Sequence, residues 1–483
     1  MASKDGRIDE GLSKLGISGH SSLTPTTSVL INFPAQDRRQ TAKLTGELLS
    51  DNHAKYHCFF NERRFHNHIV HHLLALYSLG ADGKAIQASY DREVPSQKPI
   101  AGVDNEKITV KNWTSFLGQA EYYKNYLNFF CEEIENKGAV EAIQEYIFGN
   151  PDSQMLNRTF SGVLHPLIHW GYGLEFKLDG IVAEGLAITA VHGANLSNLK
   201  LSELLTEHAT HGAPKRHHGD GNQKGIEPSF DFRCEESHKI YKPRTGLSAF
   251  QILHKISQEA DLVDPIFQTY DTREQFSKAA EHPALVPWFN KWEIAADCDW
   301  KEILERTKEL IWMVAVIYTT SYDQEKGKFA LNFFLMHLVT SSLFLPAILP
   351  HIDEQLRPIL LKAFFKTAIC IWVGQGRYEL RISECMKEPS FIMVPDSQSP
   401  RKADNPWFKV LASAAKHPDE HTTKIIRALS FNANTYGDSQ PGYYSCDLKG
   451  SELLDSTLFL RASIMTLNKI YWSGEGAMDS KWY

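Results

Sequence analysis

The chain has 483 residues, of which 42% are hydrophobic, so it is long enough to bury a large core. Its formal net charge is −7, from 51 basic and 58 acidic residues, and no basic run stands out. This balance argues against a nucleic-acid-binding protein, because such proteins present a concentrated positive surface.

The first 44 residues are rich in Ser, Thr, Gly and Lys and are expected to form a disordered tail. From residue 45 to 483 apolar residues recur mostly at intervals of three and four, which is the helical period. The ranges with the clearest pattern are 64–79, 114–135, 139–148, 162–176, 180–191, 246–259, 301–321, 329–345, 355–374 and 452–470. We therefore predict one all-α domain, a large helical bundle with its site between packed helices.

Two features bear on location. The seven cysteines are scattered and never form a C-x-x-C pair, and the N-terminus has no apolar signal region, so we expect a cytoplasmic protein. Residues 329–350 carry no formal charge and are long enough to span a bilayer, but polar residues interrupt them. A buried helix whose polar residues face a site is the preferred interpretation, and no membrane association is expected.

Histidines begin or occupy three strongly apolar helices. The segment HNHIVHH (66–72) holds His68 and His72 four residues apart, and HPLIH places His165 and His169 in the same way. His337 lies alone in the uncharged segment MHLVT. Imidazoles four residues apart project from one helical face and can occupy neighbouring positions around a metal ion.

A single buried histidine more often satisfies a hydrogen bond than binds a metal, and His66 and His71 could be capping or surface residues. Three apolar helices that each deliver histidines nevertheless favour a metal site. Glu175 and Glu184 could complete it, since iron commonly takes two histidines and a carboxylate. Either glutamate could instead fix a ring tautomer or belong to a buried ion pair, and we favour the tautomer-fixing role.

Several sequence signatures are missing. No G-x-G-x-x-G follows a strand pattern, and neither a Walker A motif nor a G-x-S-x-G elbow occurs. No flavin is therefore expected.

The three histidine motifs, in this order and over roughly residues 45–480, resemble the questin oxidase-like family. The resemblance implies an oxygenase of fungal secondary metabolism that uses O2 to cleave an anthraquinone-type polyketide. The cleavage is described as Baeyer–Villiger-like monooxygenation or dioxygenase-like. NADPH is described as the reductant, although this sequence shows no recognisable site for it.

The resemblance also implies an Fe(II) site with four histidines and a carboxylated lysine. By motif, the histidines are His68, His165, His169 and His337. Lys362 and Lys366 both follow in the apolar helix 355–374, and we favour Lys366, at its centre, as the ligand. The alternative for both lysines is a stem packed on apolar surface with its amine in water.

Two other functions fit the same sequence. The first is a metal-independent, NADPH-dependent Baeyer–Villiger-type monooxygenase whose histidines act as acid and base. The second is a non-catalytic accessory protein that binds polyketides. Metal content separates the first from an iron enzyme, and oxygen turnover separates an enzyme from a carrier.

Overall fold

The computed structural model describes residues 23–28, 30–35, 37–210, 239–262, 272–295, 297–389 and 405–470. Within them, helices form nearly all of the regular structure, which confirms the all-α prediction. In the N-terminal half the α-helices are α2 (Arg38–Lys55), α3 (Ile69–Ser78), α4 (Gly83–Glu93), α5 (Tyr123–Lys137), α6 (Ala139–Ile143), α7 (Met155–Phe160), α8 (His165–Phe176), α9 (Asp179–Val191) and α10 (Glu203–Thr210).

The C-terminal half continues in the same manner. Its α-helices are α11 (Ala249–Ser257), α12 (Thr272–Glu281), α13 (Val286–Phe289), α14 (Trp300–Thr320), α15 (Phe333–Ser342), α16 (Phe344–Ile348), α17 (Arg357–Gly374), α18 (Ile382–Lys387), α19 (Pro406–Ala414), α20 (Glu420–Tyr436) and α21 (Thr457–Lys469). A small antiparallel sheet in the order β2-β1-β3 joins Ser321–Asp323 (β1) to Lys328–Phe329 (β2) and Glu379–Leu380 (β3), with Tyr322 opposite Phe329 and Ser321 opposite Leu380.

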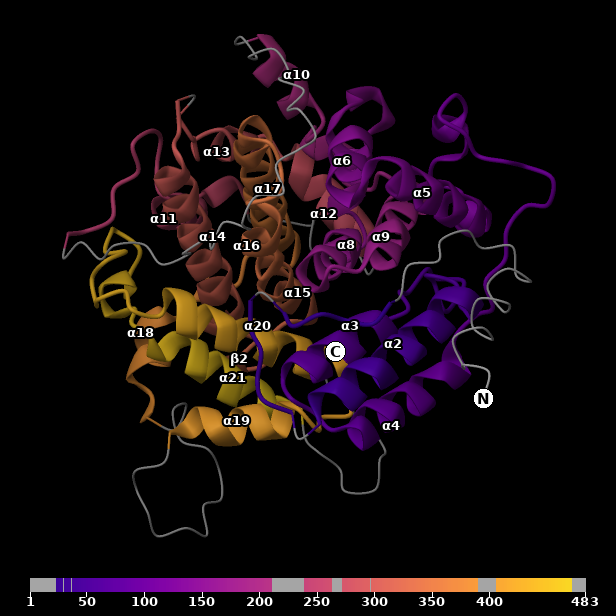
Figure 1. The fold of residues 1–483 in the computed structure, drawn as a ribbon. Helices are drawn as coiled ribbons and strands as arrows, with labels where there is room; N and C mark the ends of the chain where they lie inside the picture. The colour runs from indigo at the N-terminus through magenta and orange to yellow at the C-terminus, as the bar shows by residue number, and fades with distance from the viewer. Residues whose placement is uncertain are drawn as a thin grey trace.

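The four helices that build the site meet near the middle of the molecule. Helices α3, α8, α15 and α20 converge there although they are far apart in sequence (Figure 1), and α20 packs on both α3 and α15. All four are covered by other helices, so side chains at this junction lie in a low-dielectric interior.

Local signals explain where these helices begin. α15 starts four residues after the expected 329 because the Asn332 side chain accepts hydrogen bonds from the backbone N–H groups of Phe334 and Leu335. α20 begins behind Asp419, whose side chain accepts from Thr422 N. Among the described residues, no helix has both the length and the apolar character needed to cross a membrane.

The last residues of the predicted disordered tail (1–44) are ordered in the structure. α2 begins at Arg38, and earlier residues are already packed, with Leu23 buried and Ser28 donating to the buried Glu175 carboxylate. The expectation for residues 1–22 lies outside the described residues.

Candidate metal centre

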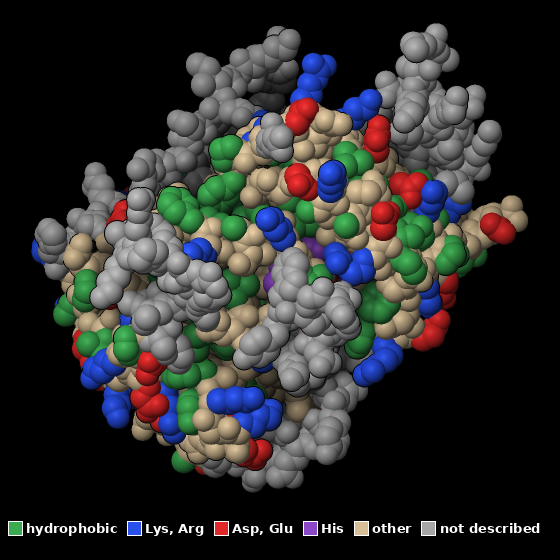
Figure 2. Space-filling view, turned by 90° about the horizontal axis from the view of Figure 1, so that it is seen from below, with side chains coloured by type: hydrophobic (Ala, Val, Ile, Leu, Met, Phe, Trp, Pro, Cys, Tyr) green, Lys and Arg blue, Asp and Glu red, His purple; other side chains and the backbone are tan. Residues whose placement is uncertain are grey.

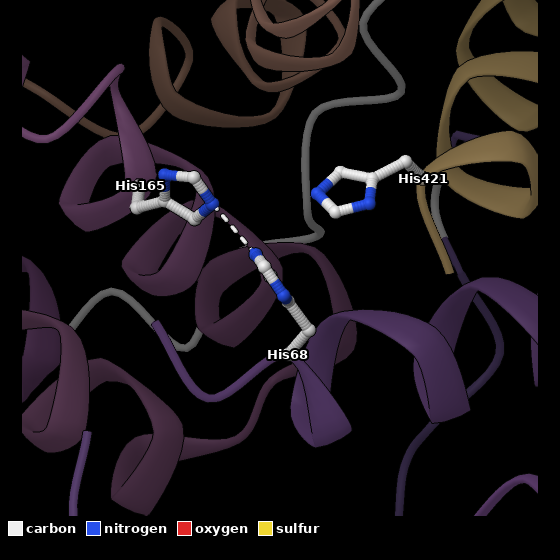
Figure 3. Close-up of side chains that lie close together, drawn as sticks. All are labelled: His68, His165 and His421. Carbon is white, nitrogen blue, oxygen red and sulfur yellow. Dashed lines mark hydrogen bonds between the residues drawn. The ribbon is translucent and has the colours of Figure 1, made fainter. Parts of the chain in front are cut away.

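The junction brings together four histidines from four helices. His68 directly precedes α3, His165 is the first residue of α8, His337 lies in the middle of α15, and His421 lies in the first turn of α20. His68, His165 and His421 each offer a ring nitrogen within 4.8 Å of the other two, and Figure 3 shows the three rings turned toward one another. The ring centroid of His337 lies 4.8 Å from that of His165 and 5.4 Å from that of His421.

An oxygen atom faces the Nδ1 atom of every one of these rings. The carbonyl oxygen of Gly162 lies 2.6 Å from His165 Nδ1, and that of Phe333 lies 2.8 Å from His337 Nδ1. One carboxylate oxygen, Glu420 Oε1, lies 3.3 Å from His68 Nδ1 and 3.2 Å from His421 Nδ1. The two carbonyl oxygens only accept hydrogen bonds, so they place the ring protons of His165 and His337 on Nδ1 and leave Nε2 as a lone-pair donor. Glu420 gives His68 and His421 a carboxylate at ion-pair distance.

The Nε2 atoms of His68 and His165 face one another at hydrogen-bond distance, so a ring proton or a metal cation has to lie between them. His68 Nε2 and His165 Nε2 are 2.7 Å apart, and His337 Nε2 is buried with no hydrogen-bond partner among the described residues. Burial lowers the pKa of all four histidines well below its ordinary value, and neighbouring positive groups lower it further. Two lone pairs at this distance would repel, so without a ring proton between them the arrangement suits a cation.

A buried lysine follows His421 on the same side of α20. Lys424 follows His421 by three residues, is 1% exposed, and its Nζ atom has no hydrogen-bond partner among the described residues. Burial lowers the pKa of Lys424 to about 8, against the opposing effect of nearby carboxylates. Its charge in turn lowers the pKa of His68, His165, His337 and His421.

The backbone before His165 is strained. Gly162, Val163 and Leu164 have φ values of 54°, 54° and 62°, a left-handed conformation that β-branched and bulky residues rarely adopt. Gly162 also admits no side chain, because a Cβ there would lie 2.5 Å from His192 Nε2. This three-residue bend turns the chain abruptly into α8 and directs His165 at the cluster.

The structure groups three of the predicted ligands and separates the fourth. His68, His165 and His337 come together, whereas both ring nitrogens of His169 have other partners. His71 Nε2 lies 3.1 Å from its Nδ1, and Glu184 Oε2 lies 2.9 Å from its Nε2. In the structure His421, rather than His169, lies with the other three histidines, and the role of His169 as a metal ligand stays a prediction.

The structure also gives the surroundings of the predicted lysines and of the predicted acid, whose roles stay predictions. Lys366 and Lys362 on α17 are both partly exposed, and the fully buried lysine beside the histidines is Lys424. Glu175 forms a buried ion pair with Arg427, which joins α8 to α20, so it is occupied away from the cluster. Glu184, by contrast, fixes the ring of His169, as one of the open alternatives stated.

The ion pair between Glu175 and Arg427 gives a test of stability. Both side chains are fully buried, so Arg427→Met leaves an uncompensated carboxylate and should lower the free energy of unfolding by about 3–5 kcal/mol. Urea unfolding of the double variant Arg427→Met/Glu175→Gln should recover part of the loss. Lys43→Met, in an exposed pair with Glu47, should change nothing measurable, and an equally mild effect of Arg427→Met would contradict the assignment.

Access to the cluster is possible from one side. The side chains of His68 and Glu420 retain 12% and 18% of their exposure. Figure 2 shows histidine side chains near the middle of the face seen from below, among hydrophobic and basic side chains.

The comparisons with known proteins place this helical chain among oxidoreductases. The model of the questin oxidase-like family matches residues 65–429. The chain is 28% identical to a Baeyer–Villiger monooxygenase of Cryptosporiopsis sp., with 82% of each chain covered. It is 26% identical to a Baeyer–Villiger oxidase of Emericella nidulans, over 92% of this chain and 93% of the relative. It is also 26% identical to the questin oxidase of Aspergillus terreus, over 79% of this chain and 78% of the relative.

The chain belongs to the questin oxidase-like family. The expected resemblance and the expected enzyme class, an oxidoreductase, are thereby confirmed.

Proposed function

We propose that this protein is a non-haem iron oxygenase that uses O2 to cleave the ring of an anthraquinone-type polyketide in fungal secondary metabolism. The observation that supports it most strongly is the pair of Nε2 atoms on His68 and His165, 2.7 Å apart, with an oxygen acceptor facing each Nδ1. The names of the relatives support the reaction class and the aromatic substrate.

The residues that would hold the iron are His68, His165, His337 and His421, with Lys424 as the fifth. Imidazole nitrogens suit Fe(II), and four neutral ligands leave its positive charge uncompensated. An ammonium group has no lone pair, so Lys424 can bind only after modification. Its amine nitrogen would form a bond to the carbon of CO2 and release a proton, which yields an anionic carbamate oxygen.

The surroundings of Lys424 favour the formation of this carbamate. A neutral amine is the species that reacts with CO2, and burial lowers the pKa of Lys424 to about 8, so a useful fraction is neutral near pH 7. Bound iron would supply the activation of dioxygen that the chain's own side chains lack. The alternative group of Asp419, Glu420 and His421 fits a metal less well, because Asp419 Oδ1 already accepts from the backbone and hydroxyl of Thr422.

Each side chain has a separate task in this proposal. Glu420 holds the rings of His68 and His421 in place through their Nδ1 atoms. Phe333 lies with its ring centroid 4.7 Å from that of His337 and 4.9 Å from that of His421, so it offers an apolar surface to a flat substrate beside the metal. The buried helices around the site exclude bulk water.

Oxygen consumption tests the proposed function. Iron-loaded protein supplied with a hydroxyanthraquinone should consume O2 and open the ring, with product identified by mass spectrometry, and NADPH should be tested in parallel. Metal-free protein that remains fully active with NADPH would support the metal-independent monooxygenase. Binding without any oxygen consumption, with or without iron, would support a carrier.

Glu420→Gln tests how the ligands are oriented. The amide keeps the size of the side chain but loses the charge that holds two Nδ1–H groups. Since partners of metal ligands typically contribute 10–100-fold to affinity, we expect iron affinity to fall by about 10–100-fold. Competition with a chelator measures this. Glu305→Gln, on α14, is a control that should keep wild-type affinity, and equal affinity in both variants would contradict the role of Glu420.

A further inference from the structure

A second row of buried polar side chains ends beside the metal cluster. His71 on α3 contacts His169 on α8, with 3.1 Å between Nε2 and Nδ1, and His169 Nε2 lies 2.9 Å from Glu184 Oε2 on α9. The other carboxylate oxygen, Glu184 Oε1, lies 2.6 Å from His53 Nδ1 on α2. All four side chains are at most 5% exposed. The row therefore crosses four helices with one hydrogen bond at each step.

Charges within the row fix which atoms carry protons. Burial alone would raise the pKa of Glu184, but the hydrogen bonds from His169 and His53 lower it to about 2. Burial alone would lower the pKa of His53, but hydrogen bonds with Cys131 and Glu184 and the charge of Glu184 raise it to about 10. His53 and Glu184 thus form a compensated ion pair. A second imidazolium at His169 would leave a net buried charge, which is costly.

The tautomer of His169 determines which nitrogen of His71 is the acceptor. The carboxylate of Glu184 accepts the proton on His169 Nε2, so His169 Nδ1 is a lone pair. This lone pair accepts a hydrogen bond from His71 Nε2–H. The remaining nitrogen, His71 Nδ1, is then an acceptor too, and it is buried without a partner among the described residues.

That nitrogen belongs to a ring next to the metal cluster. The ring centroid of His71 lies 5.9 Å from that of His68 and 6.1 Å from that of His165, and Tyr172 stacks on it at 5.3 Å. His71 belongs to neither group of described donor atoms close enough to share an ion. A buried acceptor of this kind needs a donor, and aromatic neighbours favour a donor carried on a flat, largely apolar molecule.

We propose that His71 Nδ1 accepts a hydrogen bond from a hydroxyl group of the aromatic substrate, and so selects a free phenol over its methyl ether. The inference rests on the proposed function and names the group by which that site recognises its substrate. Glu184 and His53 are positioning residues, because they act through His169 to keep His71 an acceptor. A site built to bind a hydroxyl discriminates strongly against an analogue that lacks it, since its polar atom is then left unpaired.

Binding of danthron, a dihydroxyanthraquinone, and of danthron dimethyl ether tests the proposal. Tryptophan quenching in the iron-loaded protein gives the two dissociation constants, and we expect danthron to bind at least about tenfold more tightly. His71→Leu removes the acceptor, so the ratio should fall to about one while the iron content stays at the wild-type level.

Glu184→Gln tests whether the preference for danthron depends on the tautomer of His71 or only on the packing of its side chain. The amide that this substitution introduces can donate to His169 Nε2, which moves the proton of His169 to Nδ1 and makes His71 Nε2 the acceptor. His71 Nδ1 then carries the proton and becomes a donor, so the preference for danthron should disappear or reverse. Glu93→Gln is the matched control, because Glu93 Oε1 lies 2.5 Å from Nδ1 of the neighbouring His72 but outside the row. It should keep the preference.

Each outcome supports or overturns the inference. A hydroxyl preference that persists in both His71→Leu and Glu184→Gln arises at the metal or elsewhere, and overturns it. Equal binding of both compounds to the wild type overturns it as well but leaves the proposed function intact. If neither compound binds and no oxygen is consumed, the proposed function itself fails, and this inference with it.

Discussion

Replacement of Lys424 by Met should abolish iron binding and lower kcat/KM by about 10²–10⁴-fold, because the anionic ligand is lost. Methionine has a similar length but no amine, so it removes the carbamate without opening a large cavity. The same change removes a buried amine that has no hydrogen-bond partner among the described residues, and the metal-free variant should therefore be at least as stable to heat as the metal-free wild type. Iron analysis, turnover and thermal unfolding measure the three effects.

The control is Lys366→Met, in the apolar helix α17. It should retain iron and activity, since its side chain is partly exposed. Incubation of the wild-type metal-free protein with bicarbonate should increase iron uptake, whereas Lys424→Met should not respond. Iron at wild-type levels in Lys424→Met would show that the lysine is not a ligand.

The second large effect on iron content is expected for His421→Gln, with His169→Gln as the variant to compare. His421 contributes one of the three mutually close nitrogens, so its loss should reduce iron to a small fraction of the wild-type content and activity by about 10²-fold or more. His169→Gln should keep its iron, because both nitrogens of His169 are bonded to His71 and Glu184. The measurement is iron per chain after purification in parallel. Loss of iron in His169→Gln with retention in His421→Gln would support the set inferred from sequence.

The helical fold could be predicted because most of its core helices have apolar faces. The expected helices 162–176, 180–191 and 355–374 match α8, α9 and α17 closely. The expected range 329–345 was broken into α15 and α16, since Asn332 caps the first of them and a bend follows Ser342.

Helix α20 could not be predicted from periodicity. Every residue from His421 to Asn432 is buried, including Lys424 and Arg427, and these polar and charged residues make the segment look less apolar than the buried helices that were predicted. Its functional residues were missed for that reason. A usable signal was present in D419-E-H-T-T-K424, which combines a helix-capping aspartate with a histidine and a lysine three residues apart.

The spacing along the sequence indicates which histidines share a helix, but not which of them lie together in the fold. His68, His165 and His337 each lie where an apolar helix meets the junction. His169 shares the helix of His165, but one turn further on it faces α3 and α9 rather than α15 and α20, and spacing along one helix does not reveal which neighbour a turn will face.

Iron analysis of the wild-type protein, joined to its iron-edge X-ray absorption spectrum, tests the central claim most directly. The account predicts about one iron per chain, with a first shell of nitrogen and oxygen atoms at about 2.0–2.2 Å that contains several imidazoles. Protein that is free of bound metal and still cleaves its substrate at the full rate would contradict it.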